Sequence, residues 1–149
     1  MSKTYPKQLI TLLLLLCGAA ANAHDFEHNG IFYNILSATD NTVEVTFKGN
    51  AYDSSKGEYE GVVTIPSQVT HGDATYRVTG IGDDTFRQCG TVSNVIIPAS
   101  VTSIGSNAFE LCSNLDSIVI PSSVRSIGER VFHGCEDLTS VTLPDGLTA

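Results

Sequence analysis

The chain has 149 residues, 42% of them hydrophobic, which is enough for one domain or for a small domain with an appendage. Its formal net charge is −8, and it becomes −10 once Lys3 and Lys7, which lie in the leader described next, are removed. A surface this acidic repels phosphate backbones and anionic lipid, which argues against nucleic acid as a partner. Basic partners and divalent cations remain open.

Residues 1–23 have the three parts of a secretory signal peptide. Lys3 and Lys7 form a positive n-region, Leu9–Leu16 form an apolar h-region, and Ala21–Ala23 supplies the small residues of a cleavage site. The apolar run is too short for a membrane anchor, which needs about 20 apolar residues. We expect export and cleavage after Ala23, which would leave no stable membrane span.

Lipidation of the leader is the minor alternative. Cys17 would be the acylated residue, but Leu16 stands where a lipoprotein signal has a small residue. Either route gives a secreted, periplasmic or cell-surface location.

Residues 24–77 contain no long repeat and are expected to be rich in β-structure. Runs of β-branched and aromatic residues between Asn, Asp, Gly and Ser clusters predict strands at 31–36, 42–47, 61–65 and 75–78. The stretch Thr70–Ala74 is predicted to be a hairpin loop. Because Val62–Pro66 resembles the end of the repeat that follows, residues 24–77 are interpreted as an N-terminal cap with a degenerate first repeat.

From Val78 onward the sequence repeats every 23 residues. The units are residues 78–100, 101–123 and 124–146, with a truncated start at 147–149, and nine of 23 positions are identical between the second and third units. Each unit is expected to place an aromatic residue, a thiol and an aliphatic residue in a shared core. These predicted core residues are Phe86, Cys89, Phe109, Cys112, Leu115, Phe132, Cys135 and Leu138.

The residues of one unit indicate its local structure. In Leu115–Ile120, the residues Ile118 and Ile120 share one face of a strand, which the following proline ends. The glycine of each Ile-Gly pair is expected to allow a tight turn with unusual backbone angles. The segment Ser106–Glu110 is expected to form a short helical turn that carries Phe109 inward. One coil cannot bury its own apolar face, so the coils should stack.

The pattern of Ser-Ile-Gly, Ala-Phe, Cys, Leu and Ile-Pro over residues 78–149 resembles the BspA-like leucine-rich-repeat family of bacterial surface proteins. The resemblance implies protein or glycan contacts on the repeat surface, with neither catalytic residues nor a cofactor. The predicted fold is therefore a signal peptide, then a β-rich N-terminal cap, followed by a short leucine-rich-repeat solenoid. This solenoid would have three 23-residue coils, each with a strand and a short helical turn.

The three cysteines after the leader stand at the same point of each coil. Without a C-x-x-C pair they do not fit a zinc site, and three thiols cannot all pair. A ladder of buried thiols is expected, with one disulfide as the alternative.

Two groups of residues could suggest other chemistry. His133 lies two residues from Cys135, as in a Cys–His nucleophile, but its equivalents in the other coils are Glu110 and Arg87. The position is therefore interpreted as a solvated surface site. His24, Asp25, Glu27 and His28 could hold a metal only weakly, and no metal ligand is assigned.

A binding role of the adhesion type is the favoured function. The outward residues of the repeat strands form the candidate partner face: Asn94, Ile96, Ser117, Val119, Ser140 and Thr142. One alternative is an accessory domain of a secreted hydrolase. Another is a truncated or structural fragment of a longer adhesin, because Leu147–Ala149 begins a fourth coil without a polar cap, which predicts end-to-end self-association.

Overall fold

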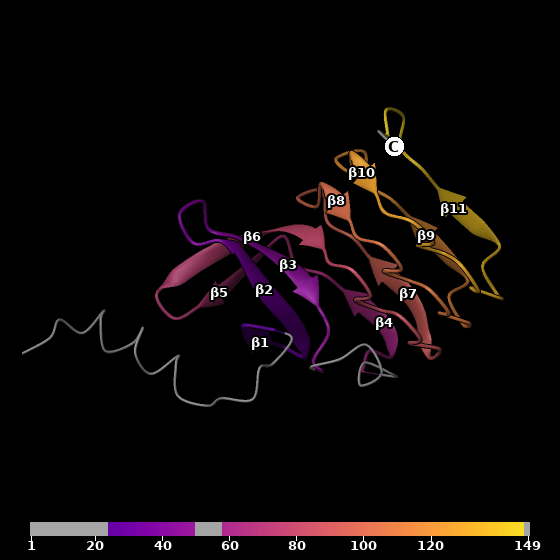
Figure 1. Cartoon of the computed structure of the whole chain (residues 1–149), viewed down its shortest axis with the longest axis horizontal. Helices are drawn as coiled ribbons and strands as arrows, with labels where there is room; N and C mark the ends of the chain where they lie inside the picture. The colour runs from indigo at the N-terminus through magenta and orange to yellow at the C-terminus, as the bar shows by residue number, and fades with distance from the viewer. Residues whose placement is uncertain (1–23, 50–57, 148–149) are drawn as a thin grey trace, which may run out of the picture.

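A computed structural model describes residues 24–49 and 58–147 of the chain (Figure 1). The predicted signal peptide, its cleavage site and Cys17 lie outside these residues. The described part is built from strands and turns and contains no helix. None of it could therefore cross a membrane as an apolar helix.

The strands fall into two groups along the chain. Those of the N-terminal part are β1 (Phe26–His28), β2 (Ile31–Ser37), β3 (Thr42–Thr46), β4 (Gly61–Thr64), β5 (Gln68–His71) and β6 (Ala74–Ile81). Those of the repeats are β7 (Val92–Ile96), β8 (Ser103–Ile104), β9 (Ser117–Val119), β10 (Ser126–Ile127) and β11 (Ser140–Thr142).

One row of strands joins the cap to the repeats. The order is β1-β2-β3-β6-β8-β10, antiparallel in the cap and parallel from β3 onward, with β5 paired to β6. The β5–β6 hairpin closes between His71 and Ala74 around Gly72, which has φ of 59°, so the predicted hairpin is confirmed with a shorter loop than Thr70–Ala74. The repeat strand β8 thus continues a sheet that begins in the cap, so the edge of β8 that faces the cap is paired with β6.

The second row consists of β4, β7, β9 and β11, which lie side by side in chain order (Figure 1). β4 pairs in parallel with β7, and β11 pairs in parallel with β9. Beyond the end of β4, the Ile65 amide donates to the Ile96 carbonyl at 3.1 Å. The segment Val62–Ile65 therefore stacks on the first repeat as a preceding coil would.

The hydrophobic core lies between the two rows. Val95 and Ile118 enter it from the second row, and Ile81 and Ile104 enter it from the first; all four are buried. Alternation of side chains along each strand places these residues inward and their neighbours outward. The core is therefore continuous from the cap through the coils.

A stack of aromatic rings runs along the core. The ring centroids of Tyr59 and Phe86 lie 4.8 Å apart, those of Phe86 and Phe109 5.1 Å, and those of Phe109 and Phe132 5.7 Å. The Tyr59 hydroxyl donates to the Thr46 carbonyl at 2.6 Å, so this residue ties the cap to the first coil. Burial raises the pKa of Tyr59 well above its ordinary value.

The glycines of the Ile-Gly pairs do not adopt the unusual angles expected from the sequence. Gly82, Gly105 and Gly128 are absent from the positive-φ residues of the described chain. They are needed for close approach instead, since a Cβ on Gly105 would lie 2.5 Å from the Asp83 backbone nitrogen. Their small size therefore sets how closely the coils stack.

The expected helical turn is also wrong, because residues 106–110 form turns rather than helix. Asn107 has φ of 55° and Leu111 has φ of 60°, so left-handed residues four apart interrupt any helical run. The same interruption recurs at the equivalent residues Asp84 and Gln88. The turns still bury Phe109 completely, as a helical turn would have done.

Candidate functional site

The outward residues of the second row form an exposed, uncharged surface. All six predicted partner-face residues lie on β7, β9 and β11, and all are exposed except Asn94, which is half-buried. Ser117 pairs with Ser140 and Val119 pairs with Thr142, so these residues form columns across neighbouring coils. The largest apolar members are Ile96, 50% exposed, and Val119, 64% exposed.

The surface extends onto the cap, beyond the residues named from the sequence. Val62, 60% exposed, pairs with Asn94, and Thr64 pairs with Ile96. The match of Val62–Pro66 to the end of a repeat could have indicated both residues. We call Val62, Thr64 and the six predicted residues the strand face.

A groove interrupts the strand face between β7 and β9. The two strands belong to separate two-stranded sheets, and a cavity of about 280 Å³ opens between them. Its lining includes Ile96, Val119 and Pro121. A site of this kind offers apolar contact and shape, with Asn94 as its polar group.

The predicted core residues occupy the interior to different extents. Phe86, Cys89, Phe109, Cys112 and Leu115 are fully buried. Phe132, Cys135 and Leu138, from the third coil, are partly buried. Ile118 is 2% exposed, whereas its equivalent Val141 is 37% exposed, because no described residue stacks on the outer side of β11. Burial in this fold thus comes from the following coil.

The cysteines form a ladder of free thiols, and the disulfide alternative is wrong for the described structure. The Cys112 thiol donates to the Phe86 carbonyl at 3.0 Å, and the Cys135 thiol donates to the Phe109 carbonyl at 3.0 Å. Burial raises the pKa of both Cys112 and Cys135. A nucleophilic cysteine needs a lowered pKa, so these thiols have the opposite character.

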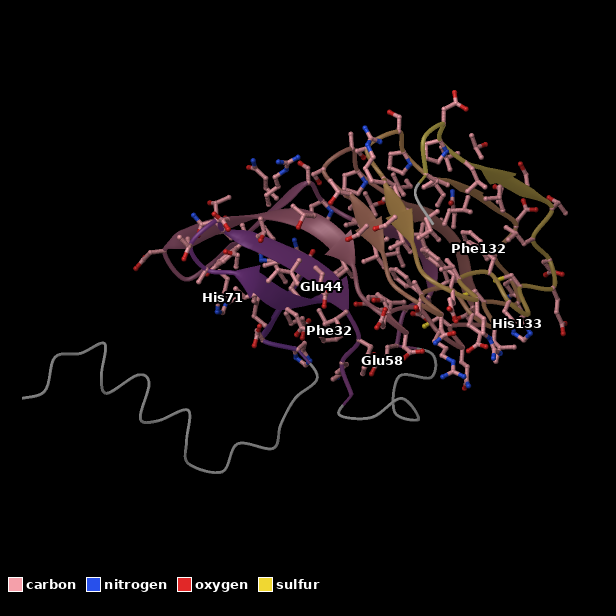
Figure 2. All side chains as sticks on the ribbon, turned by 45° about the horizontal axis from the view of Figure 1, so that its top comes forward. Phe32, Glu44, Glu58, His71, Phe132 and His133 are labelled. Atoms are coloured by element: carbon pink, nitrogen blue, oxygen red, sulfur yellow. The ribbon has the colours of Figure 1, made fainter. Side chains whose placement is uncertain are left out.

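The position shared by Arg87, Glu110 and His133 is the expected solvated surface site at His133, which is exposed, but not at Arg87 and Glu110, which are largely buried. The Glu110 side chain is 3% exposed and contacts both Arg87 and Arg130. His133 Nδ1 lies 3.3 Å from Glu110 Oε1. The three equivalent residues therefore meet across coils as a ladder centred on the Glu110 carboxylate, at the end of the molecule marked by His133 in Figure 2.

Two of the four residues considered for weak metal binding make hydrogen-bonding contacts within the cap. His24 Nδ1 lies 3.0 Å from the Lys48 carbonyl oxygen, and Asp25 accepts a hydrogen bond from the Ile35 amide at 2.7 Å. Across residues 24–49 and 58–147, no three His, Cys, Asp or Glu side chains gather as metal ligands would.

Two rows of short parallel strands, closed by turns and repeated every 23 residues, define a leucine-rich-repeat solenoid. The profile described as "BspA type Leucine rich repeat region (6 copies)" matches residues 63–149. The chain belongs to the BspA-type leucine-rich-repeat family. No curated protein matches the chain significantly in sequence.

Solved structures show the same fold. A leucine-rich repeat protein from Bacteroides ovatus is 39% identical, with a TM-score of 0.72 over 84% of this chain and 31% of that one. The leucine-rich repeat protein of T. pallidum is 24% identical, with a TM-score of 0.65 over 83% of this chain and 51% of that one. The chain thus spans about a third to a half of the length of these two proteins.

Proposed function

We propose that this chain is an exported, non-catalytic protein that binds a partner protein or surface glycan through the strand face, in a role of the adhesion type. Export is supported by the signal-like residues 1–23. The acidic charge of the chain disfavours nucleic acid as the partner.

The observation that carries this proposal is the exposure of three aliphatic side chains on adjacent strands. Val62, Ile96 and Val119 are 60%, 50% and 64% exposed, and a groove lies between the last two. Large apolar side chains exposed on the same face of neighbouring strands favour an interaction site there. The exposed small polar residues Ser117, Ser140 and Thr142 on β9 and β11 leave these strands accessible to a partner.

The test replaces two of these side chains in the double variant I96D/V119D. Labelled protein would be measured by flow cytometry for binding to epithelial and bacterial cell surfaces. We expect the double variant to lose binding while its melting temperature is kept, because the replaced side chains face solvent. L36D is the matched control, since Leu36 is 53% exposed but lies on β2. Equal binding by the folded double variant would contradict the proposal.

Self-association through the third coil is a second candidate, favoured by a separate observation. Val141 is 37% exposed and Leu143 54% exposed, whereas their equivalents Ile118 and Ile120 are each 2% exposed. This surface would accept another coil, from a second copy. Light scattering should then show association that rises with concentration and is abolished in V141S/L143S. A monomer at all concentrations would contradict it.

A further inference from the structure

A second groove, separate from the strand face, crosses the first row of strands. It has a volume of about 540 Å³ and a floor made by Gly82, Gly105 and Gly128 with Ser103 and Ser126. This size falls within the range of ligand pockets, about 300–1,000 Å³. We call it the serine–glycine trough.

The trough is a consequence of how the coils stack. A Cβ on Gly128 would lie 2.4 Å from the Ser106 nitrogen, so this position packs against the backbone of the preceding coil and cannot carry a side chain. The amides of Gly82, Gly105 and Gly128 donate to carbonyls of the preceding strand at 2.8 Å each. These three amides are therefore not free for a ligand, and the polar groups that we consider for recognition are the side chains of the lining.

Two carboxylates stand over this floor. Glu44 lies on β3, labelled in Figure 2, and a Cβ on Gly82 would lie 3.1 Å from its Oε1. A Cβ on Gly105 would lie 2.4 Å from Asp83 Oδ1, and that oxygen accepts the Ser106 amide at 2.7 Å. Both carboxylates are thus held at the trough. The Ser106 amide donates to Asp83, and the Asn34 side chain donates to Glu44.

Within residues 24–49 and 58–147, no cationic side chain lines the trough, since its lining contains no lysine, arginine or histidine. The described ion pairs all involve Asp84 or Glu110, and none involves Glu44 or Asp83. The pKa of Glu44 is raised by burial and, to a smaller extent, by repulsion from Asp83, which a cation in the trough would relieve.

We propose that the serine–glycine trough is a second interaction surface that takes an extended basic segment of a partner protein, with an arginine side chain held by Glu44 and Asp83. A guanidinium offers five donors in a planar fork, which suits two carboxylates and the hydroxyls of Ser103 and Ser126. A bare divalent cation fits less well, because only two carboxylates are present and the described chain has no cluster of three metal ligands. The strongly acidic chain would also attract a basic segment from a distance.

The experiment is a titration of the ¹⁵N-labelled exported protein with the peptide acetyl-Gly-Arg-Gly-Arg-Gly-amide, followed by NMR. The same peptide with citrulline in place of arginine is the uncharged control. We expect saturable chemical-shift changes at the amides of Gly82, Gly105 and Gly128 with the arginine peptide but not with the citrulline peptide. In E44Q/D83N the affinity should fall by about tenfold or more, as for loss of charge-assisted hydrogen bonds.

E136Q/D145N is the matched variant, since it removes the same net charge from exposed positions of the third coil. It should bind the arginine peptide as the unmodified chain does. Shifts spread over the acidic surface, or equal binding by E44Q/D83N, would overturn the proposal. So would shifts at the trough caused by Ca²⁺ or by a neutral oligosaccharide but not by the arginine peptide.

Discussion

Arg130 Nη2 lies 2.6 Å from Glu110 Oε1, so a guanidinium of the third coil contacts a carboxylate that the second coil buries. On the other side the same carboxylate contacts Arg87 of the first coil. One buried charge thus links three successive coils, and its removal should affect how they stack.

The first prediction concerns this carboxylate. E110Q should destabilise the protein by about 3 kcal/mol, because it removes the closer anionic partner of the largely buried Arg87 and leaves only the 3.5 Å contact with Asp84. R130A should cost less than about 1 kcal/mol, because the Arg130 side chain is 59% exposed and solvent screens its charge. Urea unfolding measures the free energy of unfolding of both variants. Equal effects of the two variants would show that Glu110 is not the centre of the ladder.

The second prediction concerns the close approach of the coils. G105A places a Cβ 2.5 Å from the Asp83 nitrogen and 2.7 Å from the Gly82 carbonyl carbon, neither of which can move alone. We expect a loss of about 3 kcal/mol in the free energy of unfolding. G90A is the control: its Cβ would meet only the Ser113 hydroxyl, at 3.0 Å, which can rotate away. A G105A protein as stable as G90A would refute the stacking geometry.

The third prediction concerns pH. Because burial raises the pKa of Glu44, the folded state binds this proton more tightly than the unfolded state does. Stability should therefore fall as pH rises from the ordinary carboxyl range, about pH 4, through the raised pKa. E44Q carries no such charge, so its melting temperature should match that of the unmodified chain near pH 4 and exceed it at pH 7. A lower melting temperature for E44Q at pH 7 would contradict this account.

The fourth prediction concerns the thiol ladder. Cys89 and Cys112 are buried and Cys135 is partly exposed, while burial raises the pKa of Cys112 and Cys135. Iodoacetamide should modify Cys135 first in the native protein, slowly, and all three at similar rates in urea. Peptide mass spectrometry measures the order. Rapid native labelling of Cys112 would show that the ladder opens in solution.

The sequence predicted those features that depend on its 23-residue period. The buried positions of Phe86 and Phe109 follow from that period, since a repeated coil places equivalent residues in one column. Tyr59 was missed, because it lies 27 residues before Phe86 and joins the aromatic stack only through the fold.

Contacts between coils were the hardest to foresee. A position that changes from Arg87 to Glu110 to His133 looks unconstrained along the chain, yet stacking brings the three together. The change from arginine to glutamate at one point of the period was the available signal. The left-handed conformation of Leu111 had a weaker signal, namely the glycine at the equivalent position Gly134, because leucine itself seldom adopts this conformation.

The most direct test of the central claim is hydroxyl-radical footprinting of the protein bound to a cell surface, read by mass spectrometry. If the partner binds the strand face, Val62, Ile96 and Val119 should be protected from oxidation in the bound protein, whereas Leu36 on β2 should still be oxidised. If the three strand-face residues are oxidised equally in the free and bound protein, the partner binds elsewhere and the proposed function of this face is wrong.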